Sequence, residues 1–179
     1  MRSLILLPLL ALAPLSAGAV DWHIGAAAHD ALDGRTPDFG GARVDADTGR
    51  SLFGGVRFDS GFGVEAAWLD LGDASQNAVA DAGYSVDGKL WSVALSFAPD
   101  TGALQPYAKV GWFDRDEDGV FVGIAGPVPI SYDDDGLMAE VGGRWFATRS
   151  FALRAGYSWY DFEPEADGSV MIAAEWHFR

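Results

Sequence analysis

The sequence has no cysteine and few cations, with 12 lysines and arginines against 26 aspartates and glutamates. Without cysteine the chain can form neither a disulfide nor a cysteine-ligated metal centre. The net charge of −14 argues against a nucleic-acid partner, because phosphates would be repelled. After the first nineteen residues there is also no apolar run long enough for a membrane-spanning helix.

The first nineteen residues predict a secretory signal peptide. Residues 1–3 give a short positive start, residues 4–15 are almost wholly apolar, and the segment ends in the small-x-small sequence Ala-Gly-Ala. Cleavage between Ala19 and Val20 would leave one exported domain, residues 20–179. The alternative is an uncleaved anchor, but two prolines interrupt a run that already falls short of the ~20 residues needed to span a bilayer.

The rest of the chain alternates between apolar and polar or small residues, which is typical of β-strands. No helical pattern competes with this alternation. It predicts eight strands, at residues 21–29, 51–59, 62–71, 89–98, 104–113, 137–146, 151–160 and 169–178. Short turns alternate with longer polar loops, which we expect at residues 30–50, 72–88, 114–136 and 161–168. This arrangement indicates an all-β fold, an eight-stranded antiparallel up-and-down barrel.

One phase of the alternation is free of charge, and it carries all seven tryptophans. Eight strands enclose an interior too narrow for so many aromatic rings, so this phase should face outward into lipid. The tryptophans sort to strand ends, as expected of aromatic girdles at the two membrane interfaces. A soluble sandwich with an aromatic core is the alternative, and it does not predict this sorting. We expect Trp22, Trp145 and Trp176 at the short-turn rim and Trp68, Trp91, Trp112 and Trp159 at the long-loop rim.

The other phase carries charges of both signs. The predicted inward residues are Arg57, Glu65, Lys109, Glu140, Arg144, Arg154 and Glu175. Isolated buried ions cost several kcal/mol, so we expect these side chains to pair. Together with Tyr107, Phe113 and Tyr160 they would fill the interior, which gives a structural or surface-interaction role. The alternative is that the charges line a narrow pore.

With its predicted signal peptide, eight alternating strands and the aromatic-rich final strand "SVMIAAEWHF", the chain resembles small bacterial outer-membrane barrel proteins such as the OmpA transmembrane domain and OmpX. The resemblance implies a monomer in the outer membrane, in contact with its lipid and lipopolysaccharide, and without a cofactor. It also implies that the barrel-assembly machinery reads the final strand. Trp176 and Phe178 give the expected aromatic ending, although Arg179 follows.

Some small barrels of this kind modify lipid A, with a histidine that activates a serine. The chain has three histidines, His23, His29 and His177, and only His29 is expected near the outer rim, close to Ser51. The His-x-Ser motif of the known deacylases is absent, and no Cys/His cluster suggests zinc or haem. We therefore predict that the protein is not an enzyme, with lipid A modification as an alternative.

An acidic segment after the fifth predicted strand begins like a calcium-binding EF-hand loop, with Asp114, Asp116 and Asp118 followed by glycine. An EF-hand is excluded, because its twelfth position needs a glutamate and is Ala125 here. Three further carboxylates return at the other end of the segment: Asp133, Asp134 and Asp135. In a hairpin the two clusters would meet at the outer rim, where they are either solvated or bind Ca²⁺ weakly. The apolar residues 119–131 between them would extend the barrel as a hairpin or present a contact patch.

Overall fold

The computed structural model describes residues 20–30, 32, 44–77, 83–123, 125–162 and 166–178, so the predicted signal peptide lies outside the described residues. Every regular element among the described residues is a β-strand. No helix in this part of the chain is long and apolar enough to cross a membrane. The strands are β1 (Val20–His29), β2 (Val44–Ala46), β3 (Gly49–Phe58), β4 (Phe62–Asn77), β5 (Gly83–Phe97), β6 (Leu104–Gly123), β7 (Gly126–Phe146), β8 (Phe151–Tyr160) and β9 (Asp167–Phe178).

The long strands close into a ring. Neighbours around it follow the order β3, β1, β9, β8, β7, β6, β5 and β4, all antiparallel, and β4 pairs again with β3. The ring is completed at β1, where Trp22 lies level with Val56 on one side and with Phe178 on the other. The predicted eight-stranded up-and-down barrel is therefore confirmed. The short strand β2, which the sequence does not predict, adds to β4 above the barrel.

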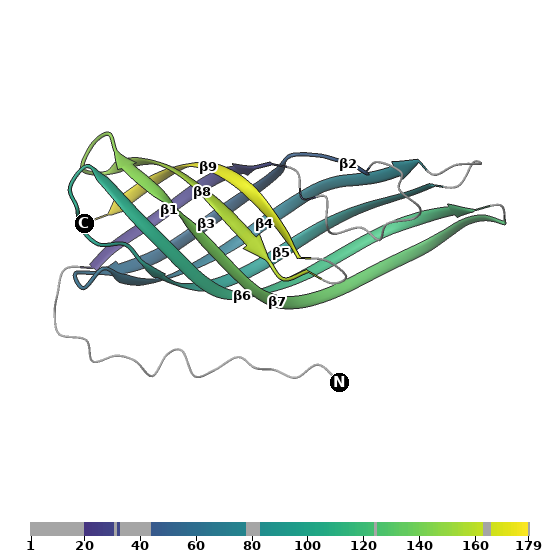
Figure 1. The fold of residues 1–179 in the computed structure, drawn as a ribbon, viewed down its shortest axis with the longest axis horizontal. Coiled ribbons are helices and arrows are strands. Elements are labelled where there is room, and N and C mark those ends of the chain that lie inside the picture. Colours follow the sequence, from purple (N-terminus) through teal and green to yellow (C-terminus); the bar gives the residue numbers. More distant parts are fainter. Residues whose placement is uncertain are drawn as a thin grey trace.

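Four neighbouring strands are much longer than predicted. β4 and β5 pair as far as Asn77 and Gly83, and β6 and β7 pair as far as Gly123 and Gly126. The prediction of loops over residues 72–88 and 114–136 is therefore wrong, because most of both segments is strand. Their alternation between buried and exposed residues continues, although several of the exposed residues are now acidic, among them Asp87, Asp114 and Asp116. The four strands form an extension beyond one end of the barrel (Figure 1), and the apolar residues 119–131 lie in its longest hairpin.

The three short turns lie at the opposite end of the barrel. Between β3 and β4, Gly61 adopts a φ of 85°, and its N–H donates to the Phe58 carbonyl at 2.9 Å. Between β5 and β6, Gly102 adopts a φ of 95°. Only glycine takes such left-handed conformations at little cost, so these residues allow tight reversals. Short turns at one end and the extension at the other give the barrel its two distinct ends.

The two faces of the strands differ as the alternation predicts. Outward side chains are apolar and exposed, as at Val110, which is 59% exposed, whereas the inward Arg154 is 2% exposed. All seven tryptophans lie on the outward face. Trp22 and Trp145 lie close to the short-turn end, whereas Trp68 and Trp91 pair across β4 and β5 towards the extension, with ring centroids 6.4 Å apart. The uncharged belt therefore lies between two levels of aromatic rings.

Candidate functional site

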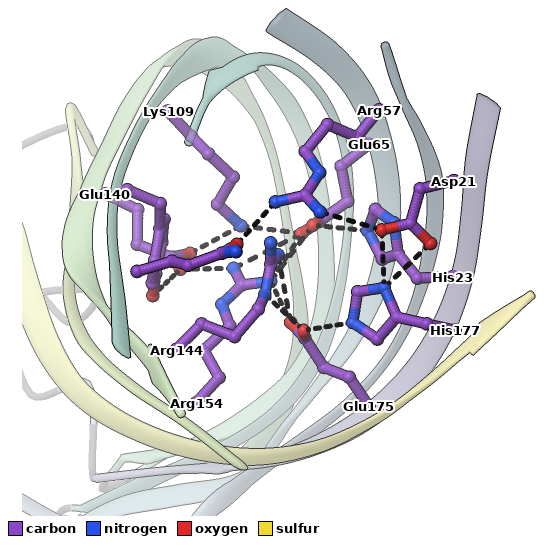
Figure 2. Close-up of polar contacts among 12 residues, drawn as sticks. Asp21, His23, Arg57, Glu65, Lys109, Glu140, Arg144, Arg154, Glu175 and His177 are labelled. Carbon is purple, nitrogen blue, oxygen red and sulfur yellow. Dashed lines mark hydrogen bonds and ion pairs between the residues drawn. The ribbon is translucent and has the colours of Figure 1, made fainter. Parts of the chain in front are cut away.

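The interior near the short-turn end holds a group of charged side chains, here called the ionic cluster (Figure 2). Each member alternates along its strand with outward apolar neighbours, which is why the strands turn it inward. The structure places all seven predicted inward charges here and adds three residues that the prediction of paired charges left out: Asp21, His23 and His177.

Arg154, on β8, is the centre of the ionic cluster. Its Nη1 lies 3.0 Å from Glu65 Oε2 and 3.0 Å from Glu175 Oε1, and its Nη2 contacts Glu140. Lys109 Nζ bridges the same carboxylates, 2.7 Å from Glu65 Oε1 and 2.8 Å from Glu140 Oε2. Charge-assisted contacts of this kind offset the cost of removing the ions from water only when every partner is present.

A second set of contacts lies between Glu175 and the short-turn rim. Arg144 Nε forms an ion pair with Glu175 Oε2 at 2.5 Å, and Arg57 Nη2 donates to Asp21 Oδ2 at 2.9 Å. His177 lies between these pairs, with Nδ1 3.0 Å from Asp21 Oδ1 and Nε2 3.1 Å from Glu175 Oε2. Carboxylates only accept hydrogen bonds, so only an imidazole protonated at both ring nitrogens can donate to Asp21 and Glu175 at once. Asp21 brings the carboxylates of the cluster to four, which equals the number of its arginine and lysine side chains.

An aromatic layer crosses the interior on the side of the extension. Phe113 meets the ring of Phe162 edge-on at 5.2 Å, and Tyr160 stacks on Phe162 at 5.2 Å and 7°. Aliphatic and small side chains from several strands complete this buried cluster: Leu32, Leu69, Leu71, Leu90, Ala94 and Met138. Phe113 and Tyr160 were predicted to lie inside, as was Tyr107, whose hydroxyl donates to Glu140 Oε1 at 2.6 Å. Phe162 was not predicted, because it lies two residues beyond the end of β8, where the alternation no longer applies.

Beyond the aromatic layer, Arg115 links the two longest strands. Its Nη2 donates to Asp134 Oδ2 at 2.9 Å, and its guanidinium lies 4.3 Å from the centroid of the Phe162 ring. Arg115 is buried on the inner face of β6, so the predicted loop at this position is wrong. Asp134 therefore does not join its neighbours on the outer face.

The outer face of the extension is acidic. Asp114 lies opposite Asp135 and Asp116 opposite Asp133, so the two predicted clusters do meet across β6 and β7. The hydrogen bond with Asp133, followed by partial desolvation and repulsion from neighbouring carboxylates, raises the pKa of Asp116. Asp118 is exposed on the same face. Within the described ranges, however, no three histidine, cysteine, aspartate or glutamate side chains are arranged to hold a metal ion.

Weak calcium binding at these carboxylates remains a prediction. Ca²⁺ accepts six to eight oxygen ligands and would relieve the repulsion between Asp116 and Asp133, with an affinity of about 10⁻⁴–10⁻³ M. Calorimetric titration of the folded barrel should show saturable heat that disappears when Asp116, Asp118, Asp133 and Asp135 are all changed to asparagine. Equal heats from both proteins, or none from the parent up to ~10 mM, would leave this face as a solvated surface.

The structure also brings together the pair that the lipid A hypothesis depends on. His29 Nε2 lies 2.9 Å from Ser51 Oγ, across β1 and β3. Both residues are buried inside the barrel, at 4% and 7% exposure, and His29 Nδ1 has no hydrogen-bond partner among the described residues. A catalytic pair needs an orienting acid at the second nitrogen and access to its substrate. Among the described residues, no acid contacts His29 Nδ1 and both side chains are buried.

A closed antiparallel ring with an uncharged outer belt, girdling tryptophans and a charged interior defines a transmembrane β-barrel. Over residues 3–178 the chain matches the family model described as "Outer membrane protein beta-barrel domain", and it belongs to that family. The family resides in the bacterial outer membrane, which agrees with the location that the sequence resemblance implies.

Solved outer-membrane barrels share this fold. Ail from Yersinia pestis is 15% identical with a TM-score of 0.60, and the match covers 90% of this chain and 99% of that one. OprG from Pseudomonas aeruginosa is 15% identical with a TM-score of 0.64, at 90% and 97% coverage. The N-terminal barrel of Pseudomonas aeruginosa OprF is 14% identical with a TM-score of 0.58, at 88% and 97% coverage. No curated protein sequence matches the chain.

Proposed function

We propose that this protein is a closed barrel that neither conducts ions nor catalyses a reaction, and that it has a structural or surface-interaction role as a monomer. It contacts outer-membrane lipid and lipopolysaccharide, and the assembly machinery recognises its final strand after signal-peptide cleavage between Ala19 and Val20. One observation carries the proposal: two layers of side chains, the ionic cluster and the aromatic layer, lie in series across the interior.

The two layers oppose ion passage for different reasons. In the ionic cluster, Arg154 and Lys109 share the carboxylates of Glu65 and Glu140, so a passing ion would have to replace contacts as short as 2.7 Å. In the aromatic layer an ion would lose its water shell against Phe113 and Phe162, which supply no polar group in exchange. An eight-stranded barrel is narrow enough for side chains to close it.

Planar-bilayer recording tests this proposal. The folded barrel should give no stepwise conductance above that of bare lipid at neutral pH. A variant with Phe113→Ala and Phe162→Ala serves as the comparison, because it thins the aromatic layer and keeps every charge of the ionic cluster. Regular conductance steps from the unmodified protein would overturn the closed-barrel role in favour of a narrow pore.

Lipid A modification is the second candidate function, and only the contact between His29 and Ser51 favours it. The burial of both residues on the lumen side argues against it, because lipid A esters lie outside the barrel wall. The non-catalytic role is therefore the better supported proposal.

A further inference from the structure

One strand of the extension has an open edge. β7 pairs with β6 from Gly126 to Trp145, but it pairs with β8 only from Met138 onwards. In the described part of the chain, no strand lies beside residues 126–137 on the side away from β6. Figure 1 shows β6 and β7 running together well past the end of β8. The opposite edge of the extension differs, because β2 covers β4 there.

The backbone groups that point out of this edge can be identified. The Leu137 carbonyl accepts a hydrogen bond from Asp161 N–H at 2.9 Å, so Leu137 directs its backbone groups away from β6. Backbone direction alternates along a strand, and residues 127, 129, 131, 133 and 135 therefore direct theirs the same way. Pro127 and Pro129 fit this assignment, since a proline has no N–H to offer to β6. Complete donor and acceptor pairs thus remain at Ser131, Asp133 and Asp135.

The side chains along this edge decide what can pair with it. Ser131, Asp133 and Asp135 are exposed on the outer face, and Tyr132, which is 37% exposed, lies on the inner face. A second copy of β7 would place further carboxylates beside these aspartates, and like charges across a strand pair are destabilising. A strand with lysine or arginine on its outer face would instead form favourable pairs with Asp133 and Asp135.

We propose that residues 131–135 of β7 bind an extended, basic segment of a partner protein by strand addition. The segment's backbone pairs with Ser131, Asp133 and Asp135, its cationic side chains face Asp133 and Asp135, and an apolar side chain between them contacts Tyr132. Backbone pairing supplies affinity, and the alternating side chains supply selectivity. The inference names the partner for the surface-interaction role proposed above and rests on that role.

The test uses the folded, isotope-labelled barrel in lipid nanodiscs and a synthetic peptide of alternating lysine and valine. The peptide should bind and slow hydrogen exchange at the amides of Ser131, Asp133 and Asp135. The amides of Tyr132 and Asp134, which point towards β6, should not change. A peptide of the same sequence with N-methyl groups on alternate backbone nitrogens is the matched control, because it keeps the charge and removes the donors.

Two variants separate backbone pairing from charge. Ser131→Pro removes an edge-directed N–H without disturbing the pairing with β6, and it should weaken binding while the barrel folds normally. Asp133→Asn with Asp135→Asn should weaken binding about 2- to 30-fold, the range expected for losing two cross-strand ion pairs.

Equal binding of the methylated and unmethylated peptides, or no protection of the three amides, would overturn strand addition. Peptide-independent dimerisation through β7 would overturn the choice of partner. Neither result bears on the closed-barrel proposal, because bilayer recording tests that proposal separately. Conversely, a conducting barrel that still binds the peptide would reject only the closed-barrel proposal.

Discussion

Replacing Arg154 with methionine should destabilise the folded barrel by about 3–5 kcal/mol, the usual cost of leaving buried charges without their partner. Arg154 contacts three carboxylates, those of Glu65, Glu140 and Glu175, and is itself 2% exposed. Methionine fills much of the same volume but leaves Lys109 as the cation between Glu65 and Glu140. Urea unfolding in lipid vesicles, followed by tryptophan fluorescence, measures the loss.

Two further variants show whether the loss comes from unpaired charge. Adding Glu65→Gln to Arg154→Met removes one of the carboxylates that lost Arg154 as a partner, and it should restore part of the stability. Arg57→Gln removes a cation nearer the rim, where the side chain is 12% exposed, and should cost less because water reaches the site. Equal losses for Arg154→Met and Arg57→Gln would contradict a central role for Arg154.

Val110→Arg should cost about 2–4 kcal/mol, since it places a charge on the lipid-facing side near the middle of the membrane. Val110→Leu is the matched control on the same face, and it should be close to neutral. The inward neighbour Gly111 is a poor control, because an added Cβ would lie 2.3 Å from the Val93 carbonyl oxygen. Folding yield and urea stability in lipid vesicles measure both changes. Equal stabilities for the two variants would mean that this face does not meet lipid.

The sequence predicts the barrel well because its pattern reflects two different solvents. Within the membrane, outward residues such as Val110 meet lipid and inward residues such as Lys109 meet the polar interior, so the two phases contrast strongly in hydropathy. Strand β8, Phe151–Tyr160, begins and ends at the predicted residues. The contrast depends on lipid, and it is lost where the strands leave the membrane.

The extension was not predicted because this hydropathy contrast is absent outside the membrane. Above the membrane the outward solvent is water, and the outward positions of β6 become Asp114, Asp116 and Asp118. Their spacing resembles an EF-hand loop, yet it is the two-residue period of a strand whose outer face has turned from apolar to acidic. Phe113, the residue before Asp114, is buried on the inner face of the same strand. The two-residue period of a strand therefore continues through this segment. Its acidic residues made the segment resemble a loop.

The pairing inside the ionic cluster could not be predicted. The alternation shows that Arg154 and Glu65 face inward, but they are 89 positions apart in the chain and meet only through the register of the whole ring. Asp21 and His177 have the inward phase, but the alternation does not show that His177 contacts both Asp21 and Glu175. Strand registers accumulate around a barrel, and the sequence of single strands does not specify them.

Depth-resolved quenching of tryptophan by brominated lipids tests the orientation of the barrel wall most directly. All seven tryptophans lie on the outward face at two levels, so bromines near the headgroups should quench strongly and bromines near the bilayer centre should quench weakly. Arg154→Met provides the comparison, because it changes the interior and leaves every tryptophan in place. Unquenched fluorescence from the folded protein, or quenching that is strongest at the bilayer centre, would contradict an outward apolar belt between two aromatic girdles.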